Sequence, residues 1–330
     1  MEITQLSIDD AEAVREVVEV LEAVRLADCP EQHPETARGY AARLRHGWDG
    51  DPPVVYTGRV GGELVGVLNV ELPTYDNTSS CWLGIDVHPA QRRKGYGSEL
   101  LAFGLDVARG NDRRTIGIGG WDLPATAGFA AHHGFEPKLV EVVRRQVPAD
   151  ADWPVLDKLY DEAARAAADY ELLRLQDAVP DELLAPASTM TAALNDAPLD
   201  DLDWEDQVFT PERIRAFEMS MAGRDRTIYR VVARHKESGE LGGHTMVGVE
   251  HERPAIGWQL DTAVVGSHRG DRLGLLLKID QLRWLRDAEP QLATIDTWNA
   301  ESNTHMIAVN EAMGYQPIAR SLDYQRKLNP

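Results

Sequence analysis

The chain has 330 residues and a formal net charge of −20, and its length favours about two domains. Apolar residues make up 43% and charged residues 27%, as in a globular protein rather than a disordered or membrane-embedded chain. The acidic balance argues against general nucleic-acid binding and is compatible with a cationic partner.

The sequence shows no targeting or metal-binding pattern. The first residues, MEITQLSIDD, lack the basic region and apolar stretch of a signal peptide, and no run approaches the ~18 apolar residues of a membrane span. Cys29 and Cys81 have neither metal-site nor disulfide spacing. We therefore predict a cytoplasmic protein that binds neither membrane nor nucleic acid and holds no metal.

The first half of the chain predicts amphipathic helices and mostly antiparallel strands. A strand and two helices come first, and two strands joined at Gly61–Gly62 follow. The next strand, CWLGIDV, leads into a glycine-punctuated turn and a helix. The expected ranges are strands 3–6, 54–60, 64–72, 81–87 and 115–121, helices 9–25 and 35–46, and then a helix and a final strand after Pro137.

The second half repeats the first. The turn QRRKGYGSELL at 91–101 is answered by HRGDRLGLLLK at 268–278, an offset of 177, and GFEP is later answered by GYQP at an offset of 180. An ordered series of matches over this distance indicates a duplicated domain. The matching elements are strands 170–175, 227–235, 242–250, 256–265 and 292–298, a helix at 211–222, a helix after the second turn, and a last helix and strand around Pro317.

The repeat sets the expected domain boundaries. The first copy spans 1–148 and the second 170–330, and the alanine-rich segment 149–169 is expected to be a solvated helical connector. The acidic stretch NDAPLDDLDWEDQ at 195–207 is expected to be a loop of the second copy.

Each glycine turn opens a helix, where main-chain N–H groups lack partners and the helix dipole is positive. Such a turn suits a phosphate group. The spacing matches neither a P-loop nor a dinucleotide fingerprint. The alternative is that the glycines only permit a tight turn.

The order of these elements around HPAQRRKGYGSELL resembles the GNAT superfamily of N-acetyltransferases, in the tandem form found in actinobacteria. The resemblance covers most of both halves. It implies an α/β (α+β) fold of two tandem GNAT-like domains, each a mixed, mostly antiparallel central sheet flanked by helices. It also implies acetyl-CoA as cosubstrate, with the pyrophosphate on the turn amides and the pantetheine along the preceding strand. The residues that would bind the cofactor are Val87, Arg92, Arg93, Lys94, Gly95, Tyr96, Gly97, Val264, Arg269, Gly270, Arg272, Leu273, Gly274, Asn299 and Asn303.

The two copies differ in their match to the family. Arg272 replaces the first signature glycine of the second copy and is itself long enough to reach a phosphate. Only the second copy has asparagines, Asn299 and Asn303, in the region where the family contacts pantetheine; each could instead be a helix N-cap. Ala130 and Asn310 lie where the family often has a tyrosine that acts as the general acid and protonates the departing thiolate. We expect a degenerate first copy and a catalytic second copy.

Three residues of the second copy are candidates for proton transfer. Glu250 ends a central strand and Asp261 lies in the next one, so either carboxylate could be the general base, although strand-end acids are often simply solvated. Tyr315 could replace the missing tyrosine acid. The oxyanion would be stabilised by main-chain amides around Val264.

The expected function is acetyl transfer from acetyl-CoA to a primary amine of a small, cationic molecule, by direct attack in a ternary complex. The acidic loop at 195–207 would lie beside this acceptor. The alternative is a non-catalytic coenzyme A-binding or protein-interaction module, because both tyrosine positions are substituted. Either a monomer or a homodimer is compatible with the sequence.

Overall fold

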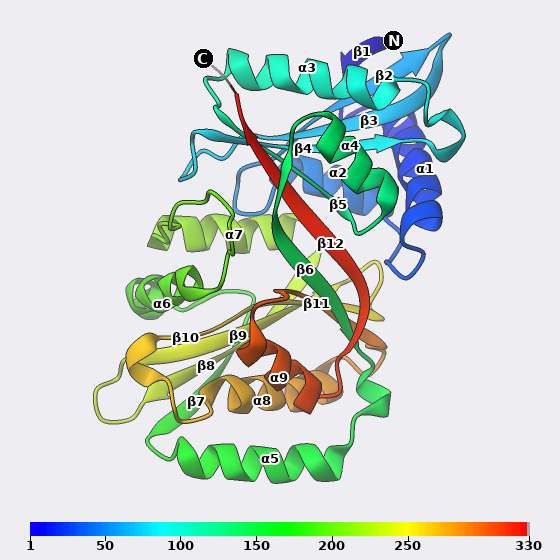
Figure 1. Cartoon of the computed structure of the whole chain (residues 1–330). Helices are drawn as coiled ribbons and strands as arrows, with labels where there is room; N and C mark the ends of the chain where they lie inside the picture. Colours follow the sequence, from blue (N-terminus) through cyan, green and yellow to red (C-terminus); the bar gives the residue numbers. More distant parts are fainter. Residues whose placement is uncertain (329–330) are drawn as a thin grey trace. The chain divides into compact units, whose positions relative to one another are not determined.

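The computed structural model describes residues 1–328. The chain forms two compact units, each built from more than one stretch of sequence (Figure 1). Unit 1 comprises Met1–Glu141, Leu199–Asp206 and the end of the chain from Ala319, and unit 2 comprises Val142–Pro198 and Gln207–Ile318.

The sheet of unit 1 has the strand order β1-β2-β3-β4-β5-β12. Neighbours run antiparallel except β4 and β5, which are parallel. Its strands are β1 (Glu2–Gln5), β2 (Val54–Val60), β3 (Glu63–Glu71), β4 (Ser80–Val87), β5 (Thr115–Trp121) and most of β12 (Gln316–Lys327). Its helices are α1 (Ala11–Asp28), α2 (Ala37–His46), α3 (Tyr96–Gly110) and α4 (Pro124–His132).

Helices cover both faces of this sheet. On one face Val17 of α1 and Tyr40 of α2 pack against Val67, and on the other Leu101 of α3 packs against Leu68. Strand β3 therefore reads as the nearly unbroken apolar run LVGVLNV, because neighbouring residues are buried on opposite faces.

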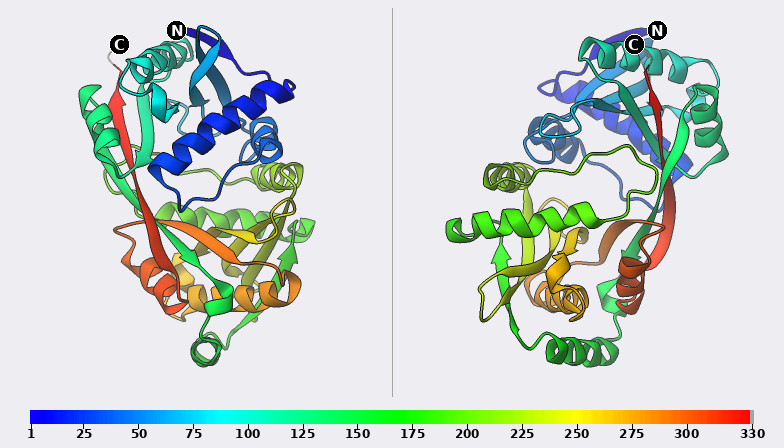
Figure 2. Two further views of the ribbon diagram at one scale, coloured as in Figure 1. Left: turned by 90° about the vertical axis from the view of Figure 1, so that its right-hand side faces the viewer. Right: turned by 60° about the vertical axis from the view of Figure 1, so that its left-hand side comes forward.

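Unit 2 repeats this plan with the order β7-β8-β9-β10-β11-β6. Its strands are the end of β6 (Glu136–Gln146), β7 (Tyr170–Gln176), β8 (Arg226–His235), β9 (Leu241–Glu250), β10 (Ile256–Val264) and β11 (Thr294–Ala300). Its helices are α5 (Trp153–Ala166), α6 (Leu184–Thr191), α7 (Pro211–Gly223), α8 (Leu273–Ala288) and α9 (Thr304–Ala312). Helix α8 covers one face of β8–β10, and α6 and α7 cover the other (Figures 1 and 2).

The last strand of each sequence copy completes the sheet of the other unit. Ser321–Lys327 of β12 pair antiparallel with Thr115–Trp121 of β5 in unit 1, and the end of β6 lies next to β11 in unit 2. This exchange was not predicted from the sequence, because the repeat indicates contiguous domains.

The segment expected to be a connector is largely helix α5. Its Leu156 packs with Ile279 and Leu282 of α8, and Ala163 packs with Leu276, so α5 is part of the unit 2 core. Helix α6 was not predicted from the sequence.

Leu199–Asp206 of the acidic stretch belong to unit 1, contrary to the expectation of a loop of the second copy, whereas residues 195–198 and Gln207 belong to unit 2. Its expected place beside an acceptor stays a prediction. Asp203 accepts hydrogen bonds from Thr115 and Lys327, and the backbone of Glu205 bonds Asn77. Thr115 begins β5, and Trp204 stacks edge-on against Trp82. The loop thus packs at the start of β5.

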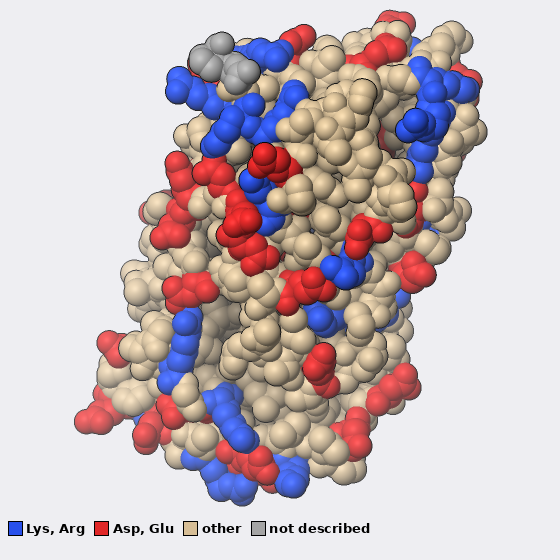
Figure 3. Space-filling model, in the orientation of Figure 1, with Lys and Arg blue, Asp and Glu red and all other residues tan. Residues whose placement is uncertain are grey.

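Among residues 1–328 no helix is long and apolar enough to cross a membrane. Acidic side chains are spread over the face in Figure 3 with basic ones between them.

Candidate functional site

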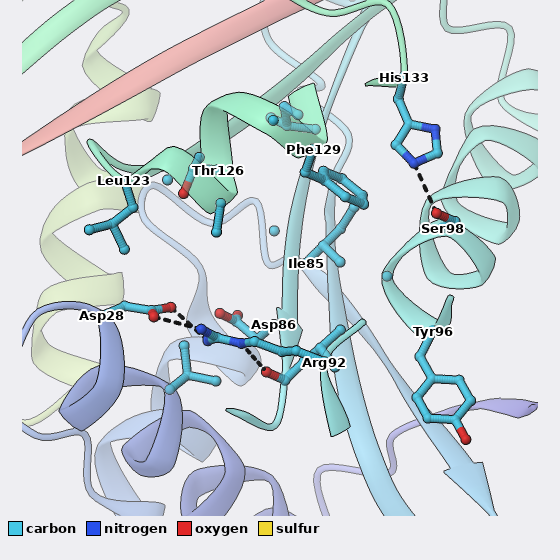
Figure 4. Close-up of a pocket in the computed structure, with 18 of the residues that line it drawn as sticks. Asp28, Ile85, Asp86, Arg92, Tyr96, Ser98, Leu123, Thr126, Phe129 and His133 are labelled. Atoms are coloured by element: carbon cyan, nitrogen blue, oxygen red, sulfur yellow. Dashed lines mark hydrogen bonds and ion pairs between the residues drawn. The ribbon is translucent and has the colours of Figure 1, made fainter. Parts of the chain in front are cut away.

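The parallel strands of unit 1 separate like a fork. Ser80–Leu83 of β4 pair with Thr115–Ile118 of β5, and the pairing stops there. A pocket of about 770 Å³ lies between the diverging ends, lined also by the start of α3, by α4 and by Asp28 of α1 (Figure 4). Because the facing edges of both strands no longer bond one another, they can bond an extended ligand.

The start of α3 supplies unpaired donors to this pocket. Arg93 and Gly95 adopt left-handed backbone conformations, with φ of 63° and 90°, which turn the chain into the helix. Across residues 1–328 the main-chain N–H groups from Arg93 to Gly97 have no acceptor. A Cβ at Gly97 would lie 3.2 Å from the ring of Phe129, closer than an ordinary van der Waals contact, so the second glycine permits the close approach of Phe129. This concave set of amides at a helix N-terminus suits a phosphate or diphosphate.

Arg92, the signature arginine, links the turn to the end of β4 and to α1. Arg92 donates from Nε to the carbonyl of Val87 at 3.1 Å, and from both terminal nitrogens to Asp28 at 2.7 Å. Its charge is therefore balanced within the protein. The side chain of Arg92, predicted to bind cofactor, fixes the end of β4 to the end of α1, and Arg92 also lines the pocket.

We call this arrangement, an arginine that bonds both the last carbonyl of the central strand and an aspartate, the clamp. It recurs in unit 2. Arg269 donates from Nε to the carbonyl of Val264 at 3.0 Å and from Nη2 to Asp196 at 2.6 Å. The amides from Gly270 to Gly274 likewise have no acceptor within the described residues. Because both units have this arrangement, we infer that the clamp positions the unpaired amides of the turn.

Arg272 is the point at which the second turn differs. It takes the left-handed conformation of the missing glycine, with φ of 56°, which is uncommon for a residue with a side chain. Its guanidinium lies 3.0 Å from Glu162 of α5, so it is paired within the protein rather than extended toward a ligand. Leu273 is buried in the core.

The fork of unit 2 contains a β-bulge. Ile256–Trp258 pair with Thr294–Asp296, after which the strands separate. The register between β10 and β9 shifts between Gln259 and Thr262, whereas β4 pairs with β3 without a shift. The bulge bends β10 and re-aims the residues at its centre.

The two carboxylates predicted as general bases differ in their surroundings. Glu250 is buried and accepts hydrogen bonds from Arg226 at 2.6 Å, Trp258 at 2.7 Å and Arg253 at 2.7 Å. Asp261, at the bulge, has no hydrogen bond within residues 1–328, and burial raises its pKa to about 6 although Arg230 acts against this. Asp261 is thus the better suited of the two to accept a proton.

Three further predicted residues make structural contacts. Tyr315 lies in the core of unit 2 with Lys278 Nζ 4.8 Å from its ring centre, and burial raises its pKa. Asn303 is the N-cap of α9 and accepts from the amide of Met306 at 3.2 Å. Asn299 accepts from the Asn310 side chain at 2.7 Å. These contacts favour structural roles, and the predicted functional roles stay predictions.

Several charged groups at both forks were not predicted from the sequence. Asp28 and Asp196 complete the clamps, Asp86 lines the pocket of unit 1, and Lys278 is buried in unit 2. A signal existed for Asp86, the one acid in the otherwise apolar strand CWLGIDV. None existed for the partners of the arginines, which lie far away in sequence. No group of three or more His, Cys, Asp or Glu among the described residues could hold a metal ion.

Fold and site together define a class of protein: two forked α/β sheets, each with a helix start whose open amides suit the diphosphate of a nucleotide cofactor. Residues 19–135 match the model of the acetyltransferase (GNAT) family. Over these residues the chain is similar to a GNAT acetyltransferase domain, and the chain as a whole has the tandem GNAT fold.

Individual relatives agree with this assignment. Over 150 residues the chain is 33% identical to mycothiol acetyltransferase of Amycolatopsis mediterranei, a match that covers 44% of each protein. A tandem GNAT protein from the clavulanic acid biosynthesis pathway is 28% identical with a TM-score of 0.80, covering 100% of this chain and 99% of that one. An acetyltransferase structure from Sphaerobacter thermophilus, 18% identical with a TM-score of 0.68 over 100% and 96% of the chains, shares the fold. The predicted fold class and family resemblance are confirmed.

Proposed function

We propose that the chain is an acetyl-CoA-dependent N-acetyltransferase that acetylates the primary amine of a small, cationic molecule in a ternary complex. One observation carries this proposal. The unpaired amides from Arg93 to Gly97 open onto a pocket between two strands that have stopped pairing. The family match and the tandem relatives support it.

The residues of unit 1 fit coenzyme A. The turn amides would hold its pyrophosphate, with Arg93 on the pocket wall adding positive charge, and the open edge of β4 toward Val87 would bond the pantetheine. Bound acetyl-CoA would supply a thioester carbonyl open to attack by an amine. In unit 2 the amides from Gly270 to Gly274 would do the same work, beside the backbone around Val264.

The protein's share of the chemistry is positioning and proton transfer. In unit 2 the Asp261 carboxylate would take a proton from the ammonium form of the acceptor, a role worth about 10²–10⁴-fold. Main-chain donors around Val264 would stabilise the oxyanion, and removing one such donor typically costs roughly 3 kcal/mol.

The charge of the chain supports a cationic acceptor. The net charge of −20 attracts cations over the whole surface, and a half-buried carboxylate such as Asp261, which has no hydrogen bond within residues 1–328, is stabilised by a bound ammonium group.

The test is thioester consumption with acetyl-CoA and a panel of amines, including polyamines, aminoglycosides and amino-acid derivatives. Turnover with a cationic amine is expected. Gly97→Glu and Gly274→Glu, which place a carboxylate in each set of amides, should each remove one acetyl-CoA binding event in calorimetry, and the double variant should lose turnover. Gly110→Glu is the matched control, because this glycine ends α3 with open space around it. Acetyl-CoA binding without turnover on any amine would favour the non-catalytic binding module instead.

A further inference from the structure

Each fork carries a half-buried aspartate three residues beyond its branch point. In unit 1 the last residue of β4 that pairs with β5 is Leu83, and Asp86 lies three residues further on. In unit 2 the last residue of β10 that pairs with β11 is Trp258, and Asp261 lies three residues further on.

This agreement is not a simple consequence of the duplication. At the offset of 177 Asp86 corresponds to Ala263, and Asp261 corresponds to Gly84. The bulge in β10, absent from β4, shifts the register between β10 and β9 by one residue and includes Asp261, whereas Asp86 pairs with Val67 in a regular ladder. In both forks an acid therefore lies three residues beyond the last pair of the parallel strands, although the two residues are not matched in the repeat.

Both acids lie on the same side of their sheets. The charged or titratable groups around Asp86 are Asp28 of α1, Tyr40 and Arg43 of α2, and Arg92 of the turn. The group around Asp261 is Arg230 of β8, which pairs with Glu218 of α7 at 3.5 Å. Helix α7 of unit 2 precedes its first hairpin as α2 does in unit 1, so the two environments correspond.

Asp86 has no hydrogen-bond or ion-pair partner among the described residues. Its carboxylate lines the pocket and accepts no hydrogen bond within residues 1–328, while its neighbours Asp28 and Arg92 bind each other (Figure 4). Burial and the charge of Asp28 raise the pKa of Asp86 to about 6, against the effect of Arg92 and Arg43. A group with these properties in a pocket is a candidate proton acceptor near neutral pH.

We propose that unit 1 is a second acetyl-transfer site, in which Asp86 takes the proton of the acceptor amine. This inference rests on the proposed function. The amine nitrogen forms the new bond to the thioester carbonyl carbon, the carbon–sulfur bond breaks, the amine proton passes to the Asp86 carboxylate, and the coenzyme A thiolate takes a proton from solvent. Unit 1 is then an active copy rather than the degenerate one expected from the sequence.

The experiment isolates unit 1 by blocking the other unit. Gly274→Glu should keep measurable turnover of the best amine, with kcat/KM rising as the pH increases through about 6, where Asp86 loses its proton. Adding Asp86→Asn should lower this residual kcat at least 100-fold and remove that step of the pH profile, while calorimetry shows acetyl-CoA affinity changed less than threefold. Asp106→Asn, an exposed aspartate of α3, is the matched control and should change neither.

Two results would overturn the inference while leaving the proposed function intact: no turnover by Gly274→Glu when the wild-type chain is active, or full residual turnover after Asp86→Asn. An inactive wild-type chain would instead overturn the proposed function together with this inference. Loss of acetyl-CoA binding by Asp86→Asn would assign the residue a structural part in the pocket and would also count against it.

Discussion

The two units share a cofactor cradle and differ in the side chains behind it. In both units an arginine bonds the last carbonyl of the central strand and an aspartate from an earlier part of the chain. In both units the amides at the helix start have no acceptor within the described residues. Behind the fork, however, unit 1 has the apolar Leu101 on α3 where unit 2 has Lys278 on α8. Duplication has kept the backbone geometry and its clamp, and the two interiors have diverged around it.

Substitution at Lys278 gives the largest expected difference in stability between the copies. Lys278 is buried, with one hydrogen bond, from Nζ to Gln259 at 2.9 Å, and burial lowers its pKa to about 7. Between pH 7 and about 10 the unfolded chain therefore carries a proton that the folded chain lacks, and the free energy of unfolding rises with pH. Lys278→Leu, which copies unit 1, should abolish this rise of about 2–3 kcal/mol between pH 7 and 9.5.

Urea unfolding at the two pH values measures this effect. Lys158→Leu, at an exposed lysine of α5, serves as the control and should keep the pH dependence. If Lys278→Leu and wild type show equal slopes, Lys278 is not held neutral in the fold.

Loss of the clamp should affect unit 1 more than unit 2. The Arg92–Asp28 pair has side-chain exposures of 30% and 18% and two hydrogen bonds, whereas the Arg269–Asp196 pair is 52% and 51% exposed with one. Arg92→Ala should therefore cost about 2 kcal/mol of stability and weaken acetyl-CoA binding to unit 1, and Arg269→Ala less than about 1 kcal/mol. Denaturant titration and calorimetry would measure both; equal costs would mean that the exposure of the pair does not decide its strength.

The cap of α9 gives the smallest expected effect. Asn303 caps this helix, while the matching helix α4 begins at Pro124 without a side-chain cap. Asn303→Ala should cost about 1 kcal/mol and leave acetyl-CoA affinity unchanged. Should the affinity fall tenfold with little loss of stability, Asn303 would be a cofactor ligand, as first predicted from the sequence.

The local features of the site could be predicted from the sequence because they depend on near neighbours. The repeated turns, the strands before them and the helices after them follow from glycine spacing and hydrophobic periodicity. The aspartates of the clamps could not be predicted in this way, since Asp28 lies 64 residues from Arg92 and only tertiary packing brings them together. The bulge in β10 also escaped prediction, because a shifted register leaves no clear mark on a short strand.

The exchange of the last strands was equally hidden. The alternating pattern of β6 and β12 predicts a half-buried strand but does not say which sheet it joins. The acidic loop at 199–206 was misplaced for a related reason, because its partners Asn77, Thr115 and Lys327 lie far away along the chain.

Because of this exchange, each half of the chain needs the other half to complete its sheet. A protease cut in the segment before β7 would leave each fragment holding a strand whose hydrogen-bonding partner belongs to the other fragment. During synthesis, unit 1 must wait for the final residues to emerge before its sheet is complete at β12. Removal of either half would therefore take the last strand from the sheet of the other half, whether or not the removed half had any chemistry of its own.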